Sequence, residues 1–186
     1  MKQLCDCLAA SIALLVLWPV LLVVALLIFL DDPGPVLFKQ ERAGRWHKPF
    51  VIYKFRTMKR NTPSISTEEM RRLGLTPYTR LGPFLRRSSL DELPQLLNVI
   101  RGEMSLVGPR PALLTQQVVL TGREQRGIHQ LRPGITGLAQ VTGRDDLPDD
   151  QKIERDYTYL RHLGLLTDVL ILIYTLRSLT GARGAY

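Results

Sequence analysis

Two adjacent carboxylates, Asp91 and Glu92, lie in the segment SSLDELPQLLNVIRGEMSLVGPRP, which covers residues 88–111. The segment ends in an arginine, Arg110, between two prolines, which hold it in an extended conformation suited to a bidentate phosphate contact. One carboxylate can attack phosphorus or bind a divalent metal while nearby cations neutralise the phosphate oxygens. The pattern therefore favours chemistry at a phosphate.

Each of these features also has a purely structural interpretation. Ser89-x-x-Glu92 matches a capping box, and Asp91 fits the cap of a helix whose first turn contains Pro94. An arginine between prolines also fits an ordinary surface turn. Capping does not exclude chemistry, because the helix dipole keeps such a carboxylate ionised and attracts a phosphate.

Other segments offer further groups for a phosphate. Lys54 and Arg56 lie on the same side of an expected strand, although a solvated strand edge has the same pattern. The segment RPGITG, which begins at Arg132, predicts either backbone amides that cradle phosphate or a tight turn. Further polar candidates follow it at Gln140, Thr142 and Arg144.

Asp168 lies inside an apolar segment, where an unpaired charge is costly. Two interpretations remain open for it. It pairs with one of the many arginines, or it supports the carboxylate and metal site.

The composition narrows the class of partner. The formal net charge is +8, from 25 Lys and Arg against 17 Asp and Glu, which favours anionic partners. Aromatic residues are rarely interleaved with the basic ones, so we expect no nucleic acid. Cys5 and Cys7 are too close for a structural disulfide, and the three histidines are too scattered for a zinc site.

Leu8 to Leu30 is a run of 23 residues without a formal charge. A straight helix of that length would cross a membrane, but Pro19 divides it into two arms, each about half a bilayer long. The segment is therefore either a kinked spanning helix or a helix that enters, bends and leaves on the same side. Residues 31–60 carry eight Lys and Arg against three acids, which places them in the cytoplasm in both cases.

The remaining chain predicts a small α+β domain. Residues 36–40 and 49–55 are β-rich and predict a hairpin, and residues 59–80 predict a mobile loop with a helical patch at 67–73. Helical periodicity covers residues 93–100, 112–120, 152–163 and 166–179. Residues 131–148 predict a structured loop that lines a site, and the last apolar helix predicts packing in the core or against the bilayer.

Taken in order along the chain, these segments resemble the monotopic phosphoglycosyl transferases of the bacterial sugar transferase family. The resemblance rests on K-Q-x-x-D at 2–6, the proline-broken apolar segment, Y-K-F-R-T-M at 53–58, R-x-x-S-L-D-E-L-P-Q-L-x-N-V at 86–99, G-x-M-S-x-V-G-P-R-P at 102–111, R-P-G-I-T-G at 132–137, A-Q-V-x-G-R at 139–144 and an aspartate in the last apolar helix. It covers nearly the whole chain.

The resemblance implies a mostly helical α+β protein. Residues 1–32 would form a re-entrant membrane helix bent at Pro19, and residues 33–186 a cytoplasmic catalytic domain at the bacterial inner membrane, with interfacial amphipathic helices. It further implies that a UDP-sugar transfers its sugar phosphate to Asp91 with release of UMP. A polyprenyl phosphate such as undecaprenyl phosphate then takes the sugar phosphate from the covalent intermediate.

The resemblance also implies roles for individual residues. Asp91 is the nucleophile, and Glu92, with Asp91, helps to bind Mg²⁺. Asp168 and Pro19 support the site. The residues expected to bind substrate are Lys54, Arg56, Arg86, Arg110, Arg132, Gln140 and Arg144.

The chain departs from the family pattern at Trp18, where a serine usually precedes the proline of the bend, and at Leu138, Thr142 and Asp145. Homodimer formation, the sugar and the length of the polyprenol stay open. Two alternatives also remain. One is a single-pass basic membrane anchor without catalysis, for which an Asp91→Asn change is harmless and an N-terminal tag is periplasmic. The other is the same transfer without a covalent intermediate.

Overall fold

The computed structural model describes residues 2–60, 62, 74, 77–143 and 147–180. Its helices, with η for 3-10 helices, and its strands are α1 (Lys2–Asp31), β1 (Leu37–Ala43), η1 (Arg45–His47), β2 (Pro49–Phe55), α3 (Gly82–Ser88), η2 (Leu90–Gln95), α4 (Leu96–Ile100), β3 (Ser105–Val107), α5 (Gln117–Gln125), η3 (Ile128–Gln130), β4 (Gly134–Thr136), α6 (Leu138–Gly143), α7 (Asp149–Arg161) and α8 (Leu165–Thr180). The described chain is mostly helical with small sheets, which confirms the predicted α+β class.

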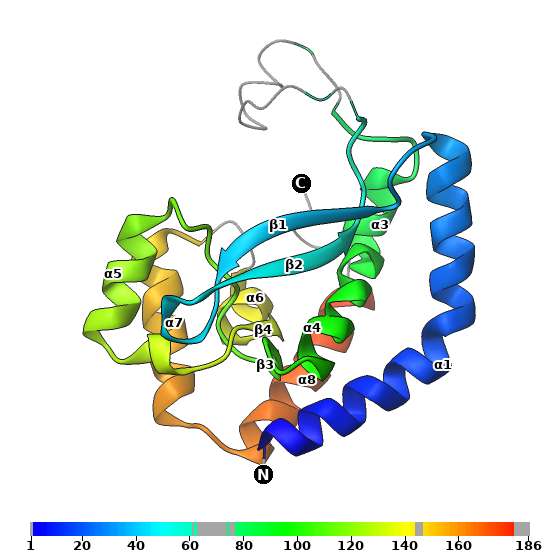
Figure 1. The fold of residues 1–186 in the computed structure, drawn as a ribbon. Helices are drawn as coiled ribbons and strands as arrows, with labels where there is room; N and C mark the ends of the chain where they lie inside the picture. The colour runs from blue at the N-terminus through cyan, green and yellow to red at the C-terminus, as the bar shows by residue number, and fades with distance from the viewer. Residues whose placement is uncertain (1, 61, 63–73, 75–76, 144–146, 181–186) are drawn as a thin grey trace.

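Helix α1 is long and changes direction partway along (Figure 1). Pro19 lies near its middle, where its missing N–H and its ring interrupt the helical hydrogen bonds, and this accounts for the bend. Before the bend, Ala10 packs into a cluster with Phe50 of β2. After the bend, Val24 and Ile28 pack into another cluster that holds Phe55 of the same strand. Both arms therefore lie against the same domain.

By length and composition, α1 is the one helix of the described residues that could cross a membrane. Most of its apolar side chains are not covered by the protein. Leu15 is 74% exposed and Trp18, beside the proline, is 54% exposed. An apolar surface of this extent needs a partner other than water.

The predicted hairpin is confirmed. β1 pairs antiparallel with β2 in a register that places Phe38 opposite Lys54 and Arg42 opposite Phe50. The first strand runs to Ala43, further than expected, because the backbone N–H of Ala43 also donates to the carbonyl of Ala112.

That same hydrogen bond explains a wrong prediction. The apolar spacing of residues 112–120 predicted a helix, but α5 begins only at Gln117. Ala112 instead extends the edge of β1, and Pro111 before it removes a helical N–H. Tertiary pairing overrides the local periodicity here.

The structure adds elements that were not predicted. The short strands β3 and β4 pair in parallel, with Ser105 opposite Gly134 and Val107 opposite Thr136. Helix α3 precedes the acidic segment. Most of the 59–80 segment, with the helical patch expected at 67–73, lies outside the described residues.

The last two predicted helices are confirmed as α7 and α8, each with slightly different ends. Ile171 of α8 is buried in a cluster with Val107 and Tyr159. Its other large apolar side chains are mostly exposed, including Leu165 at 75% and Leu176 at 65%. The helix is therefore anchored in the core along one side and bare along the other.

Candidate active site

The acidic pair lies on η2, which contacts β2 of the hairpin and the neighbouring helices α3 and α4. Ser89 adopts a left-handed conformation, φ 55°, which ends α3 and redirects the chain into η2. Its side chain makes no capping hydrogen bond, so the capping-box interpretation is wrong. Two neighbouring residues of a 3-10 helix point about 120° apart, so Asp91 and Glu92 face different surroundings.

The position of η2 depends on α4, which continues it. Asn98 of α4 is fully buried, and its side chain forms hydrogen bonds with the backbone of β2, as a neighbouring strand would. Its side chain accepts a hydrogen bond from the N–H of Tyr53 at 3.2 Å and donates to the carbonyl of Val51 at 2.7 Å. These bonds hold the acidic segment against the strand that carries Lys54.

Glu92 is held by two cations. Its Oε1 lies 2.7 Å from Nζ of Lys54 and 3.3 Å from Nη1 of Arg110. Burial by itself raises the pKa of Glu92, but the charges and hydrogen bonds of Arg110 and Lys54 outweigh it and lower the pKa to about 2. Glu92 is therefore ionised and oriented at neutral pH.

Asp91 has a different environment. It is 8% exposed, and its carboxylate makes no hydrogen bond or ion pair with any residue that the structure describes. Burial, and then the charge of Glu92, raise its pKa to about 6, although Lys54, Arg86 and Arg110 act against the increase. The group is thus a mostly ionised, weakly engaged carboxylate near three cations, which suits a nucleophile.

Arg86 is oriented by two groups from another part of the chain. Its Nε donates to Oγ1 of Thr57 at 3.2 Å, and its Nη1 donates to the Tyr78 hydroxyl at 3.2 Å. The guanidinium also lies over the Tyr78 ring, 5.0 Å from its centre. Thr57, from the Y-K-F-R-T-M segment, therefore helps to fix a cation whose charge acts on Asp91.

The Arg110 loop is anchored on both sides. The carbonyl of Arg110 accepts a hydrogen bond from Nη1 of Arg123 at 2.9 Å, and Arg123 pairs with Asp156 at 2.6 Å. On the other side, Gly108 and Gly134 approach so closely that a Cβ on Gly134 would lie 2.1 Å from the Gly108 nitrogen. A glycine at position 134 is thus required for close backbone contact, rather than for a left-handed turn.

We expect Asp156→Ala to lower the free energy of unfolding by about 3–5 kcal/mol, because it leaves Arg123 buried without its counter-ion. Chemical unfolding in detergent, followed by tryptophan fluorescence, measures the change. Glu154→Ala is the matched control: its pair with Arg126 is exposed, so its loss should cost less than about 1 kcal/mol. Equal effects of the two changes would contradict the anchoring role of Asp156.

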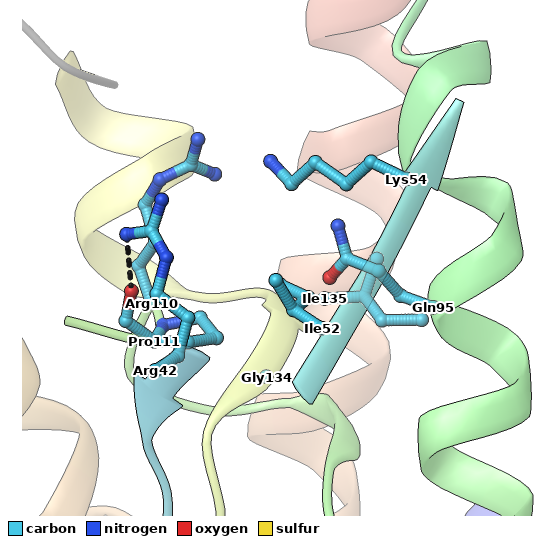
Figure 2. A pocket seen from close by; sticks show the side chains of 8 residues that line it. All are labelled: Arg42, Ile52, Lys54, Gln95, Arg110, Pro111, Gly134 and Ile135. Carbon is cyan, nitrogen blue, oxygen red and sulfur yellow. Dashed lines mark hydrogen bonds between the residues drawn. The ribbon is translucent and has the colours of Figure 1, made fainter. Parts of the chain in front are cut away.

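Lys54 and Arg110, the two cations that contact Glu92, also line a pocket (Figure 2). Its walls hold the cations Arg42, Lys54 and Arg110, the amide of Gln95, and the side chains of Ile52 and Ile135. Arg42 is fixed by a hydrogen bond from its Nη1 to the Pro111 carbonyl at 3.2 Å. Figure 2 shows Arg42 and Arg110 on one side of the opening and Lys54 and Gln95 on the other.

Three of the sequence-predicted residues contact other parts of the described chain. Arg56, just after the end of β2, contacts Asp32 at the end of α1 through both its backbone carbonyl and its carboxylate. Arg132 donates from Nε to the Gly102 carbonyl at 2.8 Å. Gln140 donates weakly to the Ile135 carbonyl, at 3.4 Å. Arg144 lies outside the described residues.

Asp168 has partners that neither interpretation named. Its carboxylate lies 2.6 Å from Nζ of Lys2 and accepts a hydrogen bond from the Tyr159 hydroxyl at 2.7 Å. Tyr159 also donates to the Val107 carbonyl, and its pKa is raised above the ordinary value by burial and then by Asp168. In the described part of the chain, Asp168 therefore joins the first turn of α1 to α7 and α8.

The acidic pair by itself offers few ligands for a metal ion. The described residues contain no group of three or more His, Cys, Asp or Glu side chains that could hold a metal. Mg²⁺, however, is commonly bound by one or two carboxylates together with substrate phosphates and water. Asp91 and Glu92 fit that arrangement.

Four residues near the site were not predicted: Gln95, Arg42, Arg123 and Asp156. Gln95 had a usable signal, because it follows Glu92 by three residues and a 3-10 helix places such residues on the same face. The other three lie far from the acidic pair in sequence, and nothing local marks them.

The chain is similar to several known proteins over most of its length. The family model described as bacterial sugar transferase matches residues 1–182. A UDP-glucose:undecaprenyl-phosphate glucose-1-phosphate transferase of Caulobacter vibrioides is 41% identical over all of this chain and 72% of its own length. A protein with the same name from Xanthomonas campestris is 40% identical, again over the whole chain, which spans 40% of that relative.

Not every relative has the same name. A UDP-N-acetylgalactosamine-undecaprenyl-phosphate N-acetylgalactosaminephosphotransferase of Aeromonas hydrophila is 40% identical over 99% of the chain and 44% of its own length. Several relatives are therefore more than twice as long as the matched region. Since the family model covers nearly the whole chain, this protein belongs to the bacterial sugar transferase family.

Proposed function

We propose that this protein is a phosphoglycosyl transferase that moves a sugar phosphate from a UDP-sugar to undecaprenyl phosphate through a covalent intermediate on Asp91. The observation that carries the proposal is the contrast between the two acids. Glu92 is bonded to Lys54 and Arg110, whereas the Asp91 carboxylate is buried, mostly ionised and not bonded to the cations around it.

In the first half-reaction, a carboxylate oxygen of Asp91 attacks the sugar-proximal phosphorus of the donor. The bond from that phosphorus to the bridging oxygen breaks, and UMP leaves with the electron pair. In the second half-reaction, an oxygen of the polyprenyl phosphate attacks the same phosphorus and displaces the Asp91 carboxylate. Since the carboxylate and the phosphates are already ionised, neither step requires a general base.

The raised pKa of Asp91 suits a reversible phosphorylation. A carboxylate with a pKa of about 6 is close in basicity to a phosphate monoester, whose second pKa is about 6. The group that attacks and the group that leaves are thus similar in each half-reaction. Neither half-reaction should therefore have a strongly unfavourable free energy.

We propose that Asp91 and Glu92 hold Mg²⁺ together with the diphosphate of the donor. The metal would neutralise phosphate charge when bound. Lys54, Arg86 and Arg110 supply fixed positive charge at the same place. They orient the phosphates and stabilise the charge that develops on the leaving oxygen.

We also propose that α1 enters the bacterial inner membrane and returns to the cytoplasmic side. Support comes from its two ends, which contact one domain: Lys2 pairs with Asp168, and Asp32 pairs with Arg56. A straight spanning helix would separate these ends by the thickness of a bilayer. The bend at Pro19, flanked by the exposed Trp18, marks the deepest part of the segment.

The exposed apolar side of α8 fits the same arrangement. Leu166, Leu170 and Ile173 are among its bare side chains. Contact of these side chains with the lipid interface would cover surface that is costly in water. The acidic pair would then face the cytoplasm close to the membrane, where a soluble donor and a lipid phosphate can both reach it.

The test is to trap the intermediate. The protein in nanodiscs is incubated with Mg²⁺ and either UDP-glucose or UDP-N-acetylgalactosamine, without any lipid acceptor. We expect stoichiometric UMP release and an intact mass increased by the sugar phosphate, with the adduct on the peptide that contains Asp91. Addition of undecaprenyl phosphate should discharge the adduct to a lipid-linked product.

Two other outcomes would overturn parts of the proposal. Full transfer activity without any adduct would favour direct transfer between the two substrates. No UMP release from any UDP-sugar would remove the enzymatic function altogether and favour a membrane anchor.

A further inference from the structure

The pocket lined by Arg42, Lys54 and Arg110 also contains a buried amide that has no role in the proposed mechanism. Gln95 is 1% exposed, and its Nε2 is buried without a hydrogen-bond partner in the described structure. Figure 2 shows the amide directed into the pocket, across from Arg42 and Arg110. A buried N–H donor without a partner is destabilising by itself, so its retention in this position points to a ligand.

The backbone explains why Gln95 points there. Residues three apart in a 3-10 helix are eclipsed, so Gln95 lies directly below Glu92 on the same face of η2. Glu92 contacts Lys54 and Arg110, and both of these cations also line the pocket. The pocket is therefore continuous with the acidic pair.

The chemistry of the walls indicates an anion. Among the residues that the structure describes, the lining contains three cationic side chains and one amide donor, and no acidic side chain. A phosphate group, with several acceptor oxygens and up to two negative charges, matches these donors.

The pocket extends toward the turn of the hairpin. Lys54 lies opposite Phe38, near the beginning of β1, whereas Arg42 lies near the turn, opposite Phe50. The beginning of β1 is also the end that follows α1. The pocket thus extends from Lys54 and Arg110 to Arg42, near the turn of the hairpin.

We infer that Gln95, with Arg42, Lys54 and Arg110, binds the phosphate of the leaving nucleotide during the first half-reaction. The inference rests on the proposed function for the identity of the donor. When the bond to the sugar-proximal phosphorus breaks, the negative charge increases on the nucleotide phosphate. Fixed donors in this pocket stabilise that charge, and Gln95 is a substrate-binding residue.

The test compares Gln95→Leu and Gln95→Glu with wild-type protein in nanodiscs. We expect Gln95→Leu to weaken UMP binding and to lower kcat/KM for the UDP-sugar by about 10- to 100-fold, because one hydrogen bond to a charged group is lost. Gln95→Glu should lower UMP binding and kcat/KM further, because a carboxylate has the same shape as the amide but adds a negative charge. Uridine, which has no phosphate, should bind equally to all three proteins.

Thermal unfolding separates binding from a structural role. If the amide serves a ligand, Gln95→Leu should unfold at the same or a higher temperature, since it removes an unpartnered buried donor. Gln125→Leu, the same change at an exposed position of α5, is the matched control for binding. Gln95→Met, which is unbranched, replaces Gln95→Leu if the latter does not fold. Unchanged UMP binding in the variants would overturn the inference.

Two further measurements complete the test. The first identifies which substrate supplies the phosphate, and the second tests the pocket independently of the proposed function. Discharge of a preformed adduct by undecaprenyl phosphate should be slowed less in Gln95→Leu than formation of the adduct from the UDP-sugar. Slower discharge with normal UMP binding would assign the pocket to the lipid phosphate instead, against our inference. Inorganic pyrophosphate should stabilise wild type but not Gln95→Leu, and this supports the pocket even if no UDP-sugar is turned over.

Discussion

Asp91→Asn should abolish transfer, with a loss of more than about 10⁴-fold in kcat, and it should also make the protein more stable. The amide cannot attack phosphorus, so no adduct forms. Stability rises because the wild-type carboxylate is ionised in a buried position that disfavours its charge. A pKa raised from 3.8 to about 6 corresponds to about 3 kcal/mol at neutral pH.

The size of this stability difference depends on pH. A carboxyl group whose folded pKa lies above its unfolded value stabilises the fold while it is protonated, below about pH 4, and loses that contribution as the pH rises through about 6. Wild type and D91N should therefore have similar unfolding free energies near pH 4 and differ most above pH 7. The rate of UMP release by wild type should rise through the same range.

Chemical unfolding of both proteins in detergent at several pH values measures the difference. Asp150→Asn, on the exposed first turn of α7, is the matched control and should change stability by less than about 1 kcal/mol. Residual turnover by D91N with an adduct on another residue would contradict the assignment of the nucleophile. A D91N protein less stable than wild type at neutral pH would contradict the environment described for Asp91.

Arg110→Ala should lower kcat/KM by several tenfold steps, about 2–4 kcal/mol of lost transition-state stabilisation. Arg110 contacts Glu92, reduces the pKa of Asp91 by its charge and lines the pocket. Steady-state assays of UMP release against donor concentration measure the loss. Arg110→Lys should have an intermediate effect, because it keeps the charge but not the planar fork of donors.

The pH profile distinguishes this role from a structural one. Without the charge of Arg110, the pKa of Asp91 rises further, so the activity that remains should reach its plateau at a higher pH than in wild type. Arg126→Ala, which removes an exposed arginine paired with Glu154, should have nearly normal kinetics. Normal rates in R110A would remove Arg110 from the catalytic site, and a loss without a shifted profile would indicate a folding defect.

Local signals were sufficient for much of the architecture. The apolar run with Pro19 predicted a long, bent α1, and the β-rich segments around a polar loop predicted the hairpin, because both depend on neighbouring residues. The acidic step and the proline-flanked arginine were also visible as motifs. Only the fold, however, places Arg110 3.3 Å from Glu92 across eighteen positions of sequence.

Other predictions failed where distant segments compete with local preference. The helix expected from Ala112 begins at Gln117, because the Ala112 carbonyl bonds to β1. Lys54 and Arg56 were expected to act together, yet one reaches Glu92 and the other Asp32, since Arg56 lies past the end of its strand. Long-range hydrogen bonds and ion pairs decide such cases, and no local pattern encodes them.

Sequence alone thus determined which residues are able to react: an acidic pair at the start of a helical segment, basic residues in several loops, and an apolar segment divided by a proline. The tertiary structure decided which of them act together. It separated the two acids into a bonded Glu92 and an unbonded Asp91, and it supported Arg110 through the buried pair of Arg123 and Asp156. The physical reason is that burial and charge depend on three-dimensional neighbours, and these are set by packing rather than by order along the chain.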